Sequence, residues 1–418
     1  MMTLIGFIYA FLETMCSSLS IYRHPVYSYI TWLIFRTQNN GFSMHAFNLK
    51  ALAAAGLTSA WLASPVAAIE IYKQGEGDNK AVVSIGGYVK MDIRHVNGDI
   101  AYQDYWVANY PGGEPTDTSH TGFNVRESRV NLKVDYGDIT GFVEIDFYGG
   151  GGNEIISNSS NPRLRHLYFT YQNWTAGQAW STFMPVRSMP ETLDFGGPFI
   201  GEAFMRAVLV RYTYGSWEFA LENPETWGDG DIGTPSSAIG LSGDDADPDE
   251  SVPDVITRYT HNADWGWVAL AGMVRQVDEG GIDETAFAAN IAGFFKVFER
   301  DDFRFQITGG EPGRYASAAM TPDIVINPAT DETEVEQTLA YSFSYRHHWN
   351  DSLRSTAYYG AAETDVLEKK RSQWGVNLIK QVNQHLKVGV EYGNYAIDDE
   401  GILAVDSDYL QVSAQMSF

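Results

Sequence analysis

Apolar and polar residues alternate along most of this chain, and the pattern is clearest at its end. Leu410, Val412, Ala414, Met416 and Phe418 alternate with Tyr409, Gln411, Ser413, Gln415 and Ser417. Because successive side chains of a strand point to opposite faces, this segment has one apolar face and one polar face. Such strands are typical of a transmembrane β-barrel, whose closed sheet satisfies every backbone hydrogen bond within the membrane.

The same alternation predicts sixteen strands, and therefore an all-β, 16-stranded antiparallel transmembrane β-barrel. The expected ranges are 83–96, 122–136, 139–148, 163–172, 174–180, 204–214, 216–223, 254–261, 264–276, 285–298, 302–308, 335–347, 351–362, 370–381, 386–395 and 406–418.

Short and long connections alternate between these strands. Tight turns follow the even-numbered strands, and the long segments 97–121, 149–162, 181–203, 224–253 and 309–334 follow odd-numbered ones. Bacterial barrels show this arrangement, with short periplasmic turns and long outer loops. A soluble β-sandwich does not predict this regularity, and about sixteen strands leave a water-filled channel. Aromatic residues near strand ends are candidates for the interfacial girdles: Trp174, Trp217, Trp265, Trp267, Tyr345 and Trp349.

The segment 181–203 is too apolar for an exposed loop. It carries Phe183, Met184, Phe195, Pro198 and Phe199. We expect it to fold into the barrel as the constriction loop. Its charged residues would then approach the opposite wall: Arg187, Glu191 and Asp194. An outer loop packed against a partner subunit is the alternative.

Basic residues recur on the inward faces of the predicted strands. The residues assigned to the constriction wall are Arg129, Lys133, Arg163, Arg165, Arg211, Arg258 and Arg346, and the alternation also places Arg94, Arg304, Arg354, Arg371 and Lys387 inside. Acidic residues share this face: Asp92, Glu127, Asp135, Glu144, Asp146, Glu218 and Glu222. The wall is therefore either an anion-guiding track or a set of neutral salt bridges, since only cations without counter-ions select anions.

The N-terminal region carries an export signal in this interpretation. Residues 44–68 contain Lys50, an apolar stretch and a Pro65-Val66-Ala67-Ala68 end, which is typical of a signal peptide cleaved near Ala68. Residues 1–43 would be an extension from an upstream start, 69–82 a short periplasmic segment and 83–418 the barrel. A genuine apolar anchor is the alternative. The single cysteine, Cys16, lies in the leader, which excludes disulfides and cysteine-zinc sites from the barrel.

Charge and motif content exclude several other functions. The net charge of −25 excludes nucleic acid as a partner. The acidic run Asp244 to Glu250 departs from the EF-hand pattern, so a solvated loop is expected over a calcium site that bridges lipopolysaccharide. Neither the Glu144/Asp146 pair nor His347-His348 has the surroundings of a catalytic or metal site. We therefore expect no cofactor, no metal and no enzymatic activity.

Two blocks of the sequence resemble the DcaP-like porins of Gram-negative outer membranes. The blocks are Arg163-Leu164-Arg165-His166-Leu167-Tyr168 with Ala176 to Met184 and Pro190 to Phe195, and Gly86 to Asp92 with Arg206 and Val210 to Thr213. The resemblance implies a homotrimer in the outer membrane, in contact with its lipid and lipopolysaccharide. It also implies passive diffusion of small hydrophilic solutes, mainly anions such as dicarboxylates. Members of the family with a coiled coil before the barrel differ from this chain, which has only residues 69–80 there.

The sequence therefore favours a diffusion porin with an anion-leaning constriction, in which Arg187 faces Arg129, Lys133, Arg163, Arg165 and Arg211 across the pore. Two other classes stay open. One is a structural or adhesive barrel whose pore is plugged by its loops. The other is an outer-membrane hydrolase, for which no convincing Ser/His/acid set is present.

Overall fold

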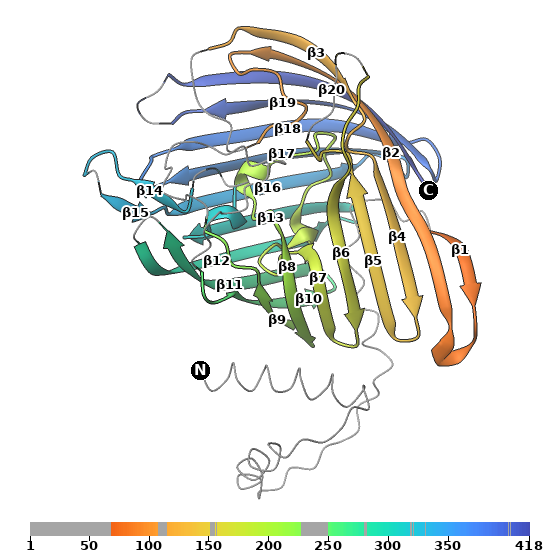
Figure 1. Cartoon of the computed structure of the whole chain (residues 1–418). Coiled ribbons are helices and arrows are strands. Elements are labelled where there is room, and N and C mark those ends of the chain that lie inside the picture. Colours follow the sequence, from red (N-terminus) through yellow and green to blue (C-terminus); the bar gives the residue numbers. More distant parts are fainter. Residues whose placement is uncertain are drawn as a thin grey trace, which may run out of the picture. The chain divides into compact units, whose positions relative to one another are not determined.

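A computed structural model describes residues 68–107, 115–150, 155, 157–226, 250–279, 282–317, 320, 322–330, 332–399, 401 and 403–418 (Figure 1). The expected signal peptide and the acidic run before Glu250 lie outside these residues. The wall of the barrel consists of β2 (Ala81–Gly98), β3 (Thr118–Asn124), β4 (Arg129–Tyr136), β5 (Ile139–Asp146), β6 (Arg163–Tyr171), β7 (Trp174–Trp180), β8 (Arg206–Tyr214), β9 (Trp217–Glu222), β10 (Asp254–Ala263), β11 (Gly266–Glu279), β12 (Ile282–Val297), β13 (Asp301–Gly310), β16 (Thr338–His348), β17 (Leu353–Thr364), β18 (Lys370–Gln381), β19 (Leu386–Ile397) and β20 (Val405–Ser417).

These strands form one closed antiparallel sheet, as predicted. Each pairs with its neighbour along the chain, and β20 closes the ring by pairing with β2 from Tyr88↔Ser417 to Gly98↔Ser407. β3 and β4 both pair with β2 and occupy a single position, so the described wall has sixteen positions. The predicted continuous strand 122–136 is therefore interrupted between Asn124 and Arg129, where Glu127 turns inward to Lys90.

The strand β1 (Ile69–Gln74) was not expected from the alternation. It pairs with the first residues of β2, from Ile69↔Ile85 to Gln74↔Ala81, and thus continues the line of β20 beyond Phe418. The backbone of Phe418 exchanges hydrogen bonds of 3.1 Å with Gly87. The first described residues therefore meet the C-terminus within the wall.

The outer face of the barrel is apolar, as the alternation predicts. On β20, for example, Leu410, Val412 and Met416 are about half exposed, while the alternating polar residues are buried inside. Aromatic rings gather near the tight turns, where Trp217 contacts Tyr259. Trp267 is the exception among the predicted girdle residues. It is 2% exposed and lies inside, since it shares its face with Ala269 and Ala271 and not with the outward Leu270. No helix in the described ranges is long and apolar enough to span a membrane.

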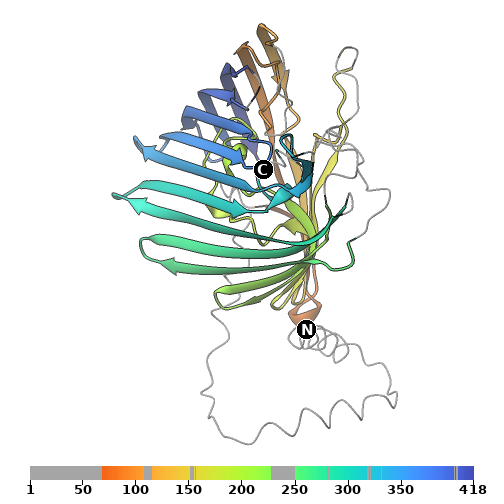
Figure 2. The same cartoon turned by 90° about the vertical axis from the view of Figure 1, so that its left-hand side faces the viewer.

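The segment between β7 and β8 folds into the barrel, as predicted (Figures 1 and 2). This infolded loop (residues 181–205) includes the short 3-10 helices η5 (Val186–Ser188) and η6 (Phe199–Gly201). Its Phe183, Met184 and Phe199 are almost fully buried. The loop contacts successive wall strands, because its polar groups bond to residues of β10, β13, β17, β18, β19, β20 and β2.

Two further connections also bury side chains inside. Trp106 in the segment after β2 stacks on Tyr395 with ring centroids 5.2 Å apart. The connection after β13 contains η7 (Gly313–Tyr315) and a two-stranded sheet of β14 (Ile324–Ile326) and β15 (Thr333–Val335), which the alternation did not reveal. Arg275 of β11 fixes this connection through a 2.6 Å hydrogen bond to Asp323.

Close packing of η6 against β16 and β17 gives the first prediction. A Cβ on Gly201 would lie 2.0 Å from the carbonyl oxygen of Tyr341, which belongs to the rigid sheet. We expect Gly201→Ala to lower the free energy of unfolding by about 1–3 kcal/mol and to displace η6. Thermal unfolding of the purified protein in detergent measures this. Gly272→Ala is the matched control, since its Cβ would have no heavy atom within 4 Å and should change stability little. Equal effects of the two variants would contradict the close packing.

Candidate functional site

The tip of the infolded loop is held by one carboxylate of the wall. Glu391 of β19 is 0% exposed and accepts hydrogen bonds from the backbone N–H groups of Leu193 at 2.7 Å and Asp194 at 2.9 Å. Three side chains also donate to it: Tyr358, Tyr409 and Asn377, at 2.8–3.0 Å. Five donors satisfy this buried carboxylate, because a buried charge is tolerated only with hydrogen-bonding partners.

Asp194 continues the same buried anchor. Its carboxylate, 1% exposed, accepts from Arg94 Nη1 at 2.9 Å and from Gln373 Nε2 at 2.8 Å. The Arg94 guanidinium lies 4.0 Å from the ring centroid of Tyr409 and 5.3 Å from that of Trp106. Burial raises the pKa of Asp194 to about 6, against the lowering effect of Arg94. We predicted from the sequence that Asp194 lines the pore. In the structure its side chain is buried in the contact between the infolded loop and the barrel wall.

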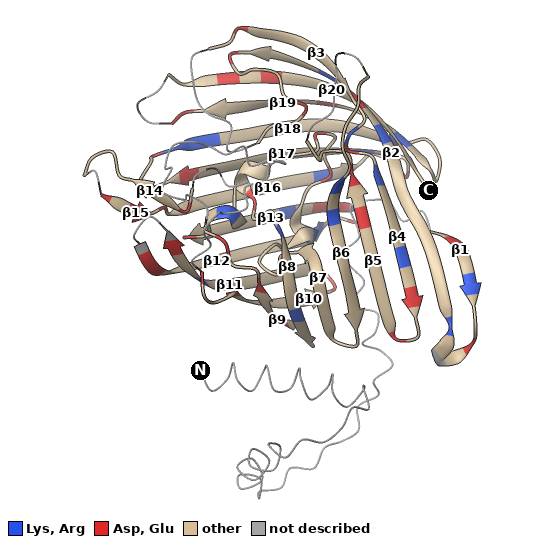
Figure 3. Cartoon of the chain, viewed as in Figure 1, with Lys and Arg blue, Asp and Glu red and all other residues tan. Residues whose placement is uncertain are grey.

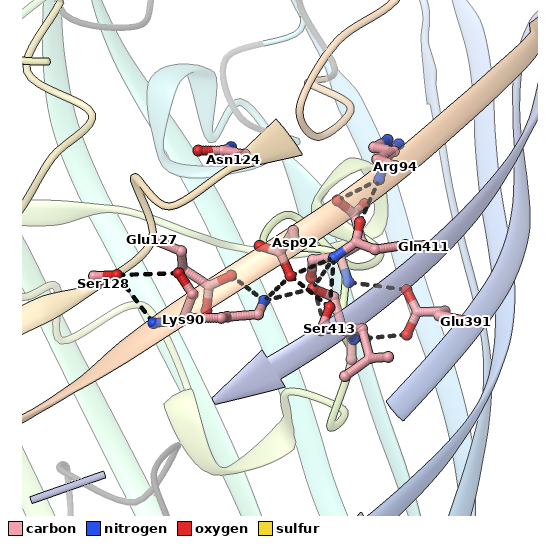
Figure 4. A network of polar contacts seen from close by, with 12 residues as sticks. Lys90, Asp92, Arg94, Asn124, Glu127, Ser128, Glu391, Gln411 and Ser413 are labelled. Atoms are coloured by element: carbon pink, nitrogen blue, oxygen red, sulfur yellow. Dashed lines mark hydrogen bonds and ion pairs between the residues drawn. The ribbon is translucent and has the colours of Figure 1, made fainter. Parts of the chain in front are cut away.

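Lys90 and its partners complete the anchor network (Figure 4). Lys90 Nζ donates to Glu127 and, at 2.6 Å, to the carbonyl oxygen of Leu193. Gln411 also donates to this carbonyl oxygen at 2.7 Å, and to Asp92 at 3.1 Å. β2, β19 and β20 therefore satisfy the backbone of the loop tip, and the side chains of this network are nearly all buried.

Glu191, just before the tip, joins three cations of the wall. Arg354 bonds it through Nε at 2.6 Å and Nη2 at 2.5 Å, Arg346 lies 3.4 Å away and Lys387 3.7 Å away. Burial alone would raise the pKa of Glu191, but the Arg354 hydrogen bonds and the charges of Lys387 and Arg346 hold it well below its ordinary value. A single carboxylate thus forms ion pairs with three cations, which come from β16, β17 and β19.

The middle of the loop lies against β10 to β13. Arg304 and Arg258 donate to the carbonyl oxygens of Met189 and Met184 at 2.6 and 2.7 Å. Arg187 is exposed, donates to Asn262 at 2.8 Å and lies 4.9 Å from the ring centroid of Trp267. Its charged neighbours are Arg304 and Arg258. We predicted that Arg187 faces a set of basic residues across the pore. In the described residues, the contacts of Arg187 do not include any of this set: Arg129, Lys133, Arg163, Arg165 and Arg211.

The short wall of β4 to β6 carries the second group of arginines. A β-bulge at Arg165 shifts the register between β5 and β6, so that Arg165 and His166 both point inward. Arg165 then bonds Glu144 at 2.8 Å and Asp146 at 3.0 Å, and Arg163 bonds Asp146 at 2.7 Å. Figure 3 shows these basic and acidic bands side by side on β5 and β6.

Cations outnumber carboxylates along the loop and the wall that faces it. Apart from the buried anchor, and not counting Arg206, Glu202 and Glu222, ten cationic side chains of the described loop and wall lie around five carboxylates, an excess of five positive charges in this set; nine of the ten contact one of these carboxylates, and Arg187 bonds Asn262. The cations are Arg129, Arg163, Arg165, Arg187, Arg211, Arg258, Arg304, Arg346, Arg354 and Lys387, and the carboxylates are Glu144, Asp146, Glu191, Glu218 and Asp302. Asp146 and Asp302 are buried beneath their partners, whereas all the cations except Arg165 and Arg354 are partly or fully exposed.

The structure brings most predicted site residues together in this cationic ring. Arg211 and Arg258 share Glu218, and Arg346 shares Glu191 and Asp302. Lys133 stands apart, in a 2.8 Å pair with Asp135 near the turn between β4 and β5. Arg304, Arg354 and Lys387 were recognised as inward cations but not assigned to the site. Only the path of the loop shows that they face it.

The described residues contain no group of three or more potential metal ligands close together. The residues of the site offer charge and hydrogen bonds.

Comparison with known proteins agrees with this geometry. Residues 89–218 match the family model of the DcaP outer membrane protein. This match confirms the resemblance to the DcaP-like porins. The matched range begins within β2, ends at the second residue of β9 and contains the whole infolded loop.

Two solved structures share the fold. The outer membrane channel DcaP of Acinetobacter baumannii is 21% identical with a TM-score of 0.70, over 84% of this chain and 100% of that one. An anion-selective porin from Comamonas acidovorans is 12% identical with a TM-score of 0.52, over 81% and 100%. A search of curated proteins finds no match to this chain.

The anchor at Glu391 gives the second prediction. Glu391→Gln replaces one acceptor oxygen by an NH₂ group that faces backbone or tyrosine donors, so at least one buried partner loses its bond. We expect the free energy of unfolding to fall by about 2–4 kcal/mol and the loop to become more mobile. Thermal unfolding and open-channel current noise measure these effects. Glu363→Gln is the control, since Glu363 is exposed on the next-but-one strand, β17. Unchanged noise in Glu391→Gln would contradict the role of Glu391.

Proposed function

We propose that this protein is an outer-membrane diffusion porin that passes small hydrophilic solutes and prefers anions. The excess of cations at the constriction is the observation that carries this proposal. Charged rings select ions only where they are not neutralised, and five of the ten cations lack a carboxylate of their own. The family match and the porin fold support a channel in the outer membrane.

The buried anchor contributes less to ion preference than its charges suggest. It contains two cations, Lys90 and Arg94, and four carboxylates, Asp92, Glu127, Asp194 and Glu391. All six side chains are at most about one tenth exposed. Solutes in the pore therefore meet the cationic ring directly, whereas burial keeps them out of contact with the anchor charges.

Dicarboxylates are the anions that this arrangement suits best. Arg129, Arg163 and Arg165 come from β4 and β6, whereas Arg346, Arg354 and Lys387 come from β16, β17 and β19. Two separate groups of cations allow one carboxylate of a solute to bind before the other is released. The resemblance to DcaP-like porins points to the same class of solute, and the solved Comamonas structure is of a porin described as anion-selective.

A plugged structural barrel is the second candidate, because three connections bury side chains inside the described wall. It predicts no conductance in a planar bilayer.

The third prediction tests ion preference. In planar bilayers with a salt gradient, we expect reversal potentials that favour the anion. Arg129→Ala and Arg211→Ala should each reduce the anion preference by roughly twofold, since each removes a charge from the wall. Lys380→Ala is the matched control, because it removes an outward-facing charge on β18. Cation preference in the unmodified protein would refute the selectivity while leaving the fold intact.

We also propose that the protein forms a homotrimer through the wall around β2, β4 and β20. Outside this sector the outer face is rich in exposed aromatic rings: Phe169, Tyr214, Trp217, Trp265, Phe287, Phe343, Trp349, Tyr359, Trp374 and Tyr392. Within it most exposed large residues are aliphatic, and the aromatic ones are Tyr72, Phe123 and Tyr136: the aliphatic ones include Val89, Met91, Ile93, Val130, Val134, Leu410, Val412 and Met416. Aromatic rings favour the lipid interface, so their scarcity suits a surface that faces another subunit.

The fourth prediction tests this surface. Val412→Trp should weaken the trimer, because a bulky ring does not fit a packed aliphatic contact. Size-exclusion chromatography with light scattering in detergent measures the oligomer. Val274→Trp on the outward face of β11 should leave it intact, since lipid accommodates the ring. Dissociation by Val274→Trp alone would place the interface elsewhere.

A further inference from the structure

Glu202, at the end of η6, is buried without a cation. It is 0% exposed, and its Oε1 accepts a single long hydrogen bond of 3.4 Å from Ser342. Its Oε2 has no hydrogen-bond partner in the described part of the chain. Apolar Ile200 lies two residues before it and packs on Ala340 and Ala362 of the wall. An ionised carboxylate in these surroundings is costly, so the docked loop favours protonated Glu202.

Asp194, at the other end of the docked segment, lies in a network with too few cations. Lys90 and Arg94 face four buried carboxylates, of which Glu391 has five hydrogen-bond donors but no cation. Arg94 alone among the cations contacts Asp194 at hydrogen-bond distance. A proton on Asp194 would reduce the negative excess of the network from two charges to one.

We propose that the infolded loop docks on the barrel wall with uptake of protons at Asp194 and Glu202, so that acid tightens the constriction and alkali loosens it. The proton uptake arises from the contact between the infolded loop and the barrel wall, and it does not depend on which ions the pore prefers.

The groups that face these two carboxylates come from every packed strand. Asp194 faces Lys90 and Arg94 of β2, Tyr105 of the segment after β2, Tyr358 of β17, Gln373 of β18, Glu391 of β19 and Tyr409 of β20. Asp92 and Glu127 contact Lys90, and Gln411 contacts Arg94. Glu202 faces Ser342 of β16, and the neighbouring Ala203 N–H donates to Gln306 of β13.

The two protons act over overlapping ranges of pH. Burial raises the pKa of Glu202 to about 8 from its ordinary 4.5, and that of Asp194 to about 6 from 3.8. A raised pKa means that the docked loop binds more protons than the free loop, so docking becomes more favourable as the pH falls from the docked value towards the ordinary one. Docking should strengthen about tenfold from pH 9 to pH 7 through Glu202 alone. From pH 7 to pH 5 Glu202 contributes roughly 70-fold more and Asp194 adds about tenfold.

Glu191 changes the docking of the loop with pH in the opposite direction. Burial opposes its charge, but Arg354, Lys387 and Arg346 lower its pKa, so its contribution to docking is present above its ordinary pKa of 4.5 and is lost at lower pH. The predicted tightening therefore occupies the range from pH 9 to pH 5.

Hydrogen exchange of the purified full-length protein tests the proposal. The N–H groups of Leu193, Asp194 and Ala203 are protected only when the loop is docked, since their acceptors belong to the wall. Mass spectrometry of peptides from 189–205 at pH 5, 7 and 9, corrected for intrinsic exchange rates, should show protection rising about tenfold from pH 9 to 7 and by a larger factor from pH 7 to 5. Glu202→Gln should abolish the step between pH 9 and 7 and reduce the step between pH 7 and 5 to about tenfold. Asp194→Asn should leave the first step unchanged and make the second about tenfold smaller.

Glu363→Gln on the outside of β17 is the control and should retain both steps. Protection that does not change with pH in the unmodified protein would overturn the proposal. So would a Glu202→Gln protein that still loosens at pH 9, even if Asp194→Asn fails to fold. Because exchange does not measure ion flow, a failed selectivity test leaves this result unaffected.

Discussion

The constriction depends on one carboxylate that accepts the backbone of the loop tip. A chain segment inside a water-filled barrel loses hydrogen bonds to water wherever it touches the wall, and each buried N–H or C=O group then needs a partner. Glu391 accepts hydrogen bonds from the backbone N–H groups of Leu193 and Asp194. Lys90 and Gln411 donate hydrogen bonds to the carbonyl oxygen of Leu193. The loop therefore has a fixed position, and the side chains on either side of the tip acquire fixed distances to the wall.

That fixed position separates the charges into two classes. At the tip, acids exceed cations, and burial keeps both from the solute. Before the tip, Glu191 binds Arg354, Arg346 and Lys387 together, so one acid is divided among three cations. Asp302 is buried beneath Arg304 and Arg346, so this part of the lining presents arginines although the chain as a whole carries a net charge of −25. Composition alone would suggest the opposite preference.

Alternation of apolar and polar residues was sufficient to predict the barrel, the inward arginines and the infolded loop. It failed where the backbone departs from the regular two-residue period. The bulge at Arg165 turns His166 inward, and the break before Arg129 sends Glu127 to Lys90. Trp267 was assigned to the outer girdle by its residue type, although its parity with Ala269 places it inside.

The sequence also did not reveal how deeply each charged side chain is buried. Asp194 and Glu191 are three residues apart on the same loop, and nothing in their local sequence distinguishes them. Asp194 is buried at Arg94, while Glu191 stays partly open among three cations, because the chain between them crosses from β17 to β2. The loop tip bonds to residues as far as 218 positions away in the chain, as Leu193 does to Gln411, and these distant partners determine the burial. Such long-range pairing is visible only once the sheet is closed.

The anchor also lies on the sector that we assign to subunit contact. β2 and β20 hold Asp92, Arg94 and Gln411 on their inner faces, and the same strands present Val89, Ile93 and Val412 on their outer faces. A strand packed on both faces has less freedom to shift than one that faces fluid lipid, since close-packed contacts resist deformation. In a trimer, the constriction loop would thus be attached to the most rigid part of the wall. The strands that face lipid could then flex without changing the width of the pore at the loop tip.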